Sequence, residues 1–118
     1  TDLSREDARS AMMQATNQGV PFTAVQTLSD AGAVGVYEAA GQLGLSIPDQ
    51  LSVVGRGDLY FTPFMSPPLT TVRTNPESLG AKSAERLMEM LNGDRDAARI
   101  EVPVQLVTRG STGPAPKT

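Results

Sequence analysis

The sequence predicts an α/β fold with a mainly parallel sheet flanked by helices. Segments with helical spacing of apolar residues alternate along the chain with short runs rich in β-branched residues. Glycine and proline separate most of these segments, and 118 residues suffice for one small domain. The first predicted element is a helix, although a doubly wound unit usually begins with a strand. We therefore expect that part of the fold lies upstream of this sequence.

The first two elements are a helix over residues 4–17 and a strand over residues 22–28. Ser4 is a residue type that caps helices, and Asp7 follows three positions later, as in a capping box. Gly19 is suited to end the helix through a left-handed conformation. The strand is apolar and β-branched without strict alternation, which is typical of a buried strand of a parallel sheet.

A helix over residues 29–43 and a strand over residues 51–55 repeat this pattern. Ser29 or Asp30 is expected to cap the helix, and Gly44 is expected to end it. The strand is followed by a polar turn. In an open α/β sheet, ligands bind at such carboxyl-terminal strand ends.

The rest of the chain is predicted to hold an irregular aromatic segment, a short strand, a helix, an alternating strand and a loose tail. Asn75 and Pro76 are good residues for opening the helix, and Gly93 for ending it. In the same order, these elements cover residues 59–65, 69–73, 76–91, 99–109 and 111–118.

Composition excludes several classes of site. The chain has neither histidine nor cysteine, which removes disulfides, zinc sites with thiolate or imidazole ligands, and histidine-based catalysis. Asp30 and Asp58 follow predicted strands, but two carboxylates without a base, nucleophile or metal partner do not make an active site. For both, a structural role as a cap or loop anchor is favoured over ligand contact. We expect no catalysis, no metal and no cofactor.

Charge and hydropathy indicate which partners and which cellular location to expect. Ten Lys and Arg against 13 Asp and Glu give a net charge of −3, so we expect no nucleic-acid binding by this chain alone. No apolar run approaches the roughly 18 residues of a membrane span, and the first residues lack the features of a signal peptide. We therefore expect a cytoplasmic protein, or a fragment of one, without membrane contact.

A longer motif links the second strand to the third. Leu-Ser-Val-Val-Gly at residues 51–55 is followed by Pro-Pro-Leu-Thr-Thr-Val at residues 67–72. With the segments at residues 44–49, 79–80 and 107–112, this motif closely resembles the LacI/GalR family of bacterial transcription repressors. The resemblance covers nearly the whole chain.

The resemblance implies the C-terminal part of a two-lobed, effector-binding core shaped like periplasmic sugar-binding proteins. A helix-turn-helix headpiece, the first lobe and the first strand of the second lobe would lie upstream. Residues 1–73 would then belong to the C-terminal lobe, and residues 74–98 would form a helix that normally packs on the other lobe. Residues 99–110 would return to the C-terminal lobe, and residues 111–118 would form a flexible tail.

The family also implies effector-binding positions, here Ser29, Arg56, Gly57 and Asp58. Gly57 stands where the family usually has an acidic or amide residue that grips ligand hydroxyls, so ordinary sugar recognition is not expected. If Arg56 turns into the cleft, it favours a phosphorylated or carboxylated effector. The alternative is an Arg56 side chain extended into solvent.

Dimerisation in this family uses the second helix and the segment before the two prolines. The matching residues are apolar or aromatic, and some could instead belong to the core. They are Val34, Tyr37, Phe61, Phe64 and Met65. The helix at residues 76–91, separated from its usual lobe, is also expected to dock against another copy or to be swapped between chains.

These observations predict a regulator that senses a small molecule, sugar-like or anionic, and forms a homodimer. DNA would be bound only through the upstream headpiece. One alternative is a sugar-binding receptor of an importer, which shares this architecture. Another is an α/β enzyme whose catalytic residues lie in the missing half.

Overall fold

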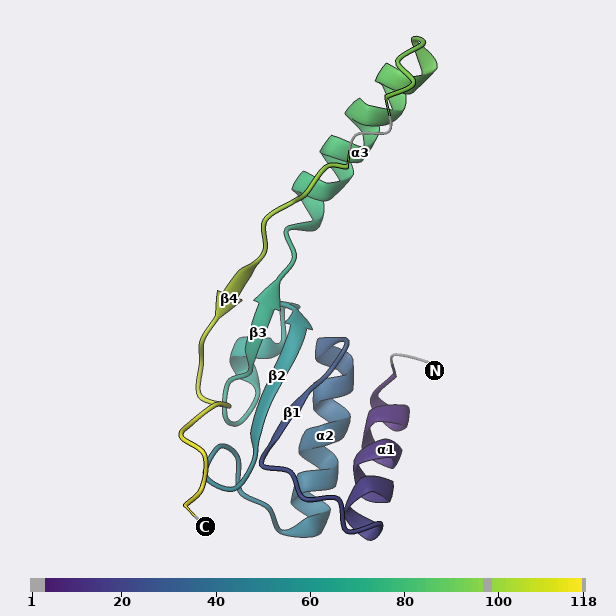
Figure 1. Ribbon diagram of the computed structural model, residues 1–118. Coiled ribbons are helices and arrows are strands. Elements are labelled where there is room, and N and C mark those ends of the chain that lie inside the picture. Colours follow the sequence, from purple (N-terminus) through teal and green to yellow (C-terminus); the bar gives the residue numbers. More distant parts are fainter. Residues whose placement is uncertain (1–3, 97–98, 118) are drawn as a thin grey trace.

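A four-stranded sheet organises the chain (Figure 1). The computed structural model describes residues 4–96 and 99–117. The strands lie in the order β1–β2–β3–β4, with β1 to β3 parallel and β4 antiparallel to β3. This arrangement confirms the predicted α/β class and its mainly parallel sheet. The strands are β1 (Ala24–Gln26), β2 (Ser52–Gly57), β3 (Thr70–Arg73) and β4 (Gln105–Val107).

Two helices, α1 (Arg5–Asn17) and α2 (Asp30–Leu43), pack against each other, and α2 also packs on β2 (Figure 1). The capping residues at their ends are those that the sequence predicted. The Ser4 hydroxyl oxygen accepts a hydrogen bond from the backbone N–H of Asp7 at 3.1 Å. Gly44 ends α2 in the left-handed conformation, at φ +68°. The sequence therefore located both helices correctly.

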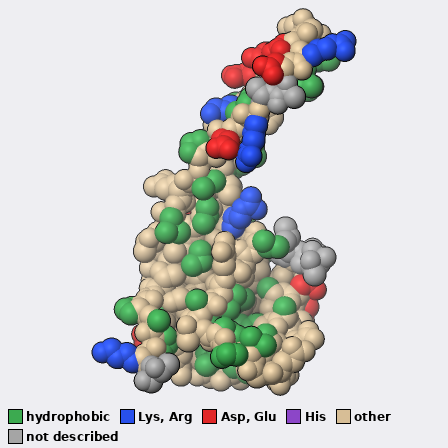
Figure 2. Space-filling model, in the orientation of Figure 1, with side chains coloured by type: hydrophobic (Ala, Val, Ile, Leu, Met, Phe, Trp, Pro, Cys, Tyr) green, Lys and Arg blue, Asp and Glu red, His purple; other side chains and the backbone are tan. Residues whose placement is uncertain are grey.

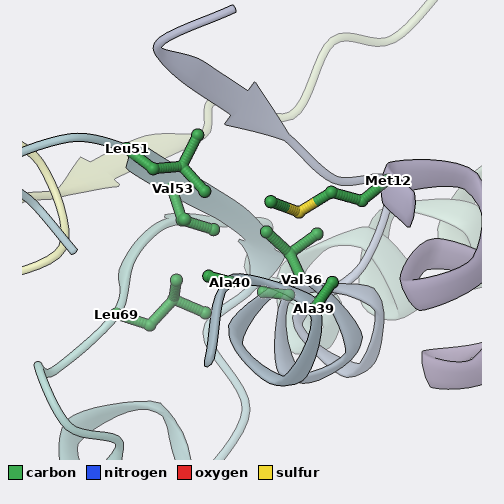
Figure 3. Packing of buried hydrophobic residues seen from close by; sticks show 8 residues of the cluster. Met12, Val36, Ala39, Ala40, Leu51, Val53 and Leu69 are labelled. Atoms are coloured by element: carbon green, nitrogen blue, oxygen red, sulfur yellow. The ribbon is translucent and has the colours of Figure 1, made fainter. Parts of the chain in front are cut away.

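The hydrophobic core lies between α2 and the sheet (Figure 3). Val36 and Ala40 of α2 face Val53 of β2, and Met12 of α1 closes one side. Small residues on α2 let its backbone approach its neighbours closely. The buried apolar residues are Met12, Ala33, Val36, Ala39, Ala40, Leu51, Val53 and Leu69.

The helix α3 (Pro76–Leu91) projects away from the sheet, and the molecule measures 58 × 27 × 26 Å (Figure 1). The helix covers the predicted residues, and Pro76 opens it. None of its 16 residues is buried. Asn75 lies at φ +48° and its side chain makes no capping hydrogen bond, unlike the expected N-cap. On the face shown in Figure 2, charged side chains gather along this projection.

The last predicted strand is shorter than expected. Of residues 99–109, only Gln105–Val107 form β4, whereas residues 99–104 are extended and lack a strand partner. They run alongside α3, and the chain joins the sheet only at β4 (Figure 1). We call α3 and residues 92–104 together the arm. Ala97 and Ala98 of the predicted 74–98 segment lie outside the described residues.

The segment expected as a loose tail begins with an anchored residue. Ser111 is fully buried. Its hydroxyl oxygen accepts from the backbone N–H of Thr70 at 2.8 Å and donates to the carbonyl oxygen of Val53 at 2.6 Å. Gly113 N–H donates to the Ser52 hydroxyl oxygen at 3.1 Å. The prediction of a loose tail is therefore wrong for residues 111–113, because they supply hydrogen bonds beside β2 and β3.

The aromatic segment after β2 contains one short 3₁₀ helix, η1 (Thr62–Phe64), as its irregular sequence suggested. Within the described part of the chain, no helix is both long enough and apolar enough to cross a membrane.

Candidate functional site

The carboxyl ends of β1, β2 and β3 meet at one edge of the sheet, because these strands are parallel. Ser29 follows β1, Arg56 and Gly57 end β2, and Arg73 ends β3. The structure thus brings the sequence-predicted effector residues to one edge, which we call the effector edge. Such edges are where open α/β sheets bind ligands.

Asp30 lies beneath this edge and is completely buried. Its Oδ1 accepts from the Thr71 hydroxyl at 2.6 Å, and its Oδ2 accepts from the backbone N–H of Leu59 at 2.7 Å. One carboxylate therefore joins the start of α2 to β3 and to the turn after β2. Ser29, whose Oγ accepts from the Gly32 N–H at 3.1 Å, is the cap instead.

Two glycines of β2 make room for this carboxylate. A Cβ atom on Gly55 would overlap Asp30 Oδ1 and lie 2.8 Å from Leu69 Cδ2. A Cβ atom on Gly57 would lie 3.2 Å from Asp30 Oδ2, and Gly57 adopts φ +127°, a conformation that side-chain-bearing residues rarely adopt. Gly57 is therefore required by the backbone of this turn.

Asp58 forms an ion cluster with two arginines. Its Oδ1 accepts from Arg109 Nη2 at 2.7 Å, and its Oδ2 accepts from Arg73 Nε at 2.7 Å. The Thr62 hydroxyl donates to Oδ1 at 3.0 Å. The Asp58 side chain is 9% exposed. Through these contacts Asp58 anchors its loop, which is the structural role that the sequence favoured for it.

The pKa of Asp58 follows from this environment. Burial alone would raise the pKa of the carboxyl group, but hydrogen bonds from Arg109, Arg73 and Thr62 stabilise its ionised form. The second effect is the larger, and the pKa of Asp58 is lowered. The carboxylate therefore stays charged throughout the neutral range.

Arg56 has the most open side chain of the predicted effector residues. It is exposed at the end of β2, and within residues 4–96 and 99–117 it has no ion-pair partner. Sequence reasoning missed Arg73, Arg109 and Thr71, which hold the carboxylates of this edge. Arg109 lies in the same Thr-Arg-Gly-Ser-Thr segment that carries the family motif, but its spacing from Asp58 gave no sign of their contact.

The predicted dimer residues differ in exposure. Phe64 is 84% exposed, and its neighbour Tyr60, which the sequence analysis did not select, is 86% exposed. Val34 and Phe61 are half-buried, and Met65 packs against the core cluster. The Tyr37 hydroxyl donates to the Pro67 carbonyl oxygen at 2.8 Å, and burial raises its pKa.

No group of three or more Asp, Glu, His or Cys side chains suited to a metal ion occurs among the described residues. The effector edge instead combines arginines, hydroxyls and carboxylates that are already hydrogen-bonded. Chemically, it can donate hydrogen bonds to a small ligand from Arg56.

Known proteins resemble this chain over almost its full length. The model of the family described as periplasmic binding protein-like domain matches residues 1–112. The chain belongs to this family, and its repressor relatives place it in the LacI/GalR group. The LacI/GalR domain is 35% identical to the HTH-type transcriptional repressor PurR of Pasteurella multocida over 107 residues, 90% of this chain and 32% of PurR.

Two further comparisons agree. Identity to the HTH-type transcriptional regulator MalR of Streptomyces coelicolor is 41% over 99 residues, 83% of this chain and 29% of MalR. The crystal structure of the lac repressor dimer bound to operator and the anti-inducer ONPF has a TM-score of 0.87 at 32% identity, covering 94% of this chain and 39% of that one. The LacI/GalR domain thus spans about a third of the PurR and MalR relatives.

Proposed function

We propose that the chain is the effector-binding and dimerisation part of a cytoplasmic transcriptional repressor. Its relatives are named transcriptional regulators, and the lac repressor structure contains a dimer, an operator and a small molecule. The effector binds at the effector edge, and DNA is bound through a helix-turn-helix headpiece upstream of this sequence. The net charge of −3 supports a separate DNA-binding element.

The exposed Arg56 is the observation that carries the choice of effector class. Asp58 is already neutralised by Arg73 and Arg109, and Asp30 is buried. Gly57 supplies no side-chain acceptor for sugar hydroxyls. Three arginines thus accompany two carboxylates at this edge, which favours an effector with a phosphate or carboxylate group over a neutral sugar.

Titration of the 118-residue chain with ribose 5-phosphate and with ribose tests this effector class. We expect the phosphate to shift the backbone amide resonances of residues 56–58 in NMR spectra, and ribose to shift them little. Arg56→Gln should weaken phosphate binding about 10-fold, because a charge-assisted hydrogen bond contributes about 1.5 kcal/mol or more.

The matched control is Arg99→Gln, since Arg99 lies on the arm and its side chain is 87% exposed. This variant should bind like the parent chain. Equal affinity for ribose and ribose 5-phosphate, or an unchanged affinity of Arg56→Gln, would contradict the proposal.

The sheet edge at β1 supports the expected upstream strand. The Thr23 carbonyl oxygen accepts from a β2 amide, and the Thr27 N–H donates to a β2 carbonyl oxygen. Because backbone groups alternate in direction along a strand, the N–H and C=O groups of Ala24 and Gln26 point away from β2. An apolar groove of about 360 Å³ runs beside this edge, between α1 and β1, with Met12 and Val36 in its lining. We infer that residues 4–73 and the returning strand β4 form the C-terminal lobe, with one further strand seated in this groove.

The exposed aromatic residues support dimerisation. Tyr60 and Phe64 project from one irregular segment, and large exposed apolar patches mark interaction sites. We expect the chain to self-associate at high concentration, and Phe64→Ser to shift the equilibrium towards monomer. Sedimentation equilibrium measures this shift, with Val20→Ser, at a half-exposed position after α1, as control. A chain that stays monomeric at every concentration would exclude this interface.

A further inference from the structure

The effector edge holds two carboxylates beside Gly57, and the structure leaves neither of them free. Asp30 is completely buried and accepts hydrogen bonds through both of its oxygens. The side chain of Asp58 is 9% exposed, and both of its oxygens are occupied as well. Because Gly57 has no side chain, a ligand at this edge meets no open carboxylate among the residues that the structure describes there.

Two arginines cover different oxygens of Asp58. Arg109 donates from Nη2 to Oδ1 at 2.7 Å, and its side chain is 17% exposed. Arg109 Nη1 also donates to the Leu69 carbonyl oxygen and the Thr62 hydroxyl, both at 2.9 Å, so this guanidinium is part of the folded body. Arg73 donates from Nε to Oδ2 at 2.7 Å, its Nη2 lies 2.6 Å from the same oxygen, and its side chain is 49% exposed. Arg73 is therefore the outer of the two arginines, and it covers Oδ2.

Arg73 lies where ligand recognition is expected. It ends β3 and is paired in register with Gly57 of β2, the position where the family resemblance places an acidic or amide residue that grips ligand hydroxyls. We propose that Arg73 is a specificity-determining residue, which keeps Asp58 Oδ2 from accepting ligand hydroxyl groups and presents positive charge at the effector edge instead. This inference rests on the proposed function, since it concerns the ligand of the same edge.

The charges of this cluster give the same preference. Two guanidinium groups surround one carboxylate, so the cluster carries one net positive charge, and Arg73 is its most exposed member. A guanidinium group suits a phosphate or carboxylate group, whereas a sugar hydroxyl donates well to a carboxylate that is free to accept. Arg73 thus favours an anionic ligand in two ways, through its own charge and by occupying the acceptor.

Replacing Arg73 with alanine tests this role. In Arg73→Ala, Arg109 and Thr62 still hold Asp58 Oδ1, whereas Oδ2 becomes free to accept from a ligand. We expect the affinity for ribose to rise about 10-fold, because a hydrogen bond to a charged group is worth about that factor. The affinity for ribose 5-phosphate should not rise, because the variant also loses a positive charge. NMR titration of the 118-residue chain measures both affinities, and their ratio should shift towards ribose by about 10-fold.

Three further variants show whether Asp58 causes this change. Arg73→Lys keeps a positive charge at this position and should keep the parent ratio. Asp58→Asn in the Arg73→Ala background removes the ionised acceptor and should return the affinity for ribose to near the parent value. Asparagine tolerates the left-handed conformation of Asp58, at φ +57°, so this change preserves the turn. Arg99→Ala, on the arm, should bind both ligands as the parent chain does.

The outcomes separate this inference from the proposed function. Equal affinities of the parent chain for ribose and ribose 5-phosphate would contradict the proposed effector class, whatever Arg73→Ala does. An unchanged ratio in Arg73→Ala, or a gain in ribose affinity that persists without the Asp58 carboxylate, would overturn the role of Arg73. Circular dichroism checks that each variant is folded, and Arg73→Thr, which suits a strand, replaces Arg73→Ala if the alanine variant is not.

Discussion

Replacing Gly35 with alanine should lower the free energy of unfolding by about 3 kcal/mol, near the upper end of what overpacking usually costs. Gly35 lies on α2 where that helix crosses α1. A Cβ atom there would overlap the carbonyl oxygen of Arg5 and lie 2.9 Å from its carbonyl carbon and 3.0 Å from the backbone nitrogen of Arg9. Backbone atoms cannot rotate away as a side chain can, so α1 itself must shift.

Gly41 provides a matched control within the same helix. A Cβ atom at Gly41 would meet no atom within 4 Å. Gly41→Ala should therefore raise stability by about 0.5 to 1 kcal/mol, because glycine is the poorer helix former. Urea denaturation followed by circular dichroism measures both variants. Equal midpoints for Gly35→Ala and Gly41→Ala would mean that the two helices do not approach as closely as described.

Local sequence signals predicted the helices well because their determinants lie within the helices themselves. Pro76 opens α3 and the capping pair of Ser4 and Asp7 opens α1, both at the expected positions. The same signals failed for residues 99–104, whose alternation suits a strand. A strand also needs a partner, and this segment lies beside α3 and joins the sheet only at β4.

The sequence predicted where the candidate site lies, but not which residues contact one another there. The family motif located Arg56, Gly57 and Asp58 at the end of β2, where the structure has them. The Asp58–Arg109 pair depends on how β3, β4 and the returning chain align, and no local pattern encodes that alignment. Likewise, a carboxylate after β1 can be either a helix cap or a buried hydrogen-bond acceptor. The sequence favoured the cap for Asp30, whereas in the structure Asp30 is a buried acceptor.

Asp30→Ala should cost about 3 kcal/mol of unfolding free energy, since each hydrogen bond to a buried carboxylate contributes about 1.5 to 3 kcal/mol. Removing the carboxylate leaves the Thr71 hydroxyl and the Leu59 N–H without their acceptor. The turn after β2 then loses its connection to α2. Hydrogen exchange at the Leu59 amide should accelerate more than exchange in α1, which measures the local part of this effect.

Variants at two neighbouring residues show whether the loss of stability comes from the Asp30 carboxylate itself. Ser29→Ala removes the side-chain cap of α2 and should cost about 1 kcal/mol. Thr71→Val removes one donor to Asp30, and combined with Asp30→Ala it should cost less than the sum of the two single changes, because both break the same contact. If Asp30→Ala costs no more than Ser29→Ala, the carboxylate does not join α2 to β3, and Gly55 and Gly57 would have to be explained without it.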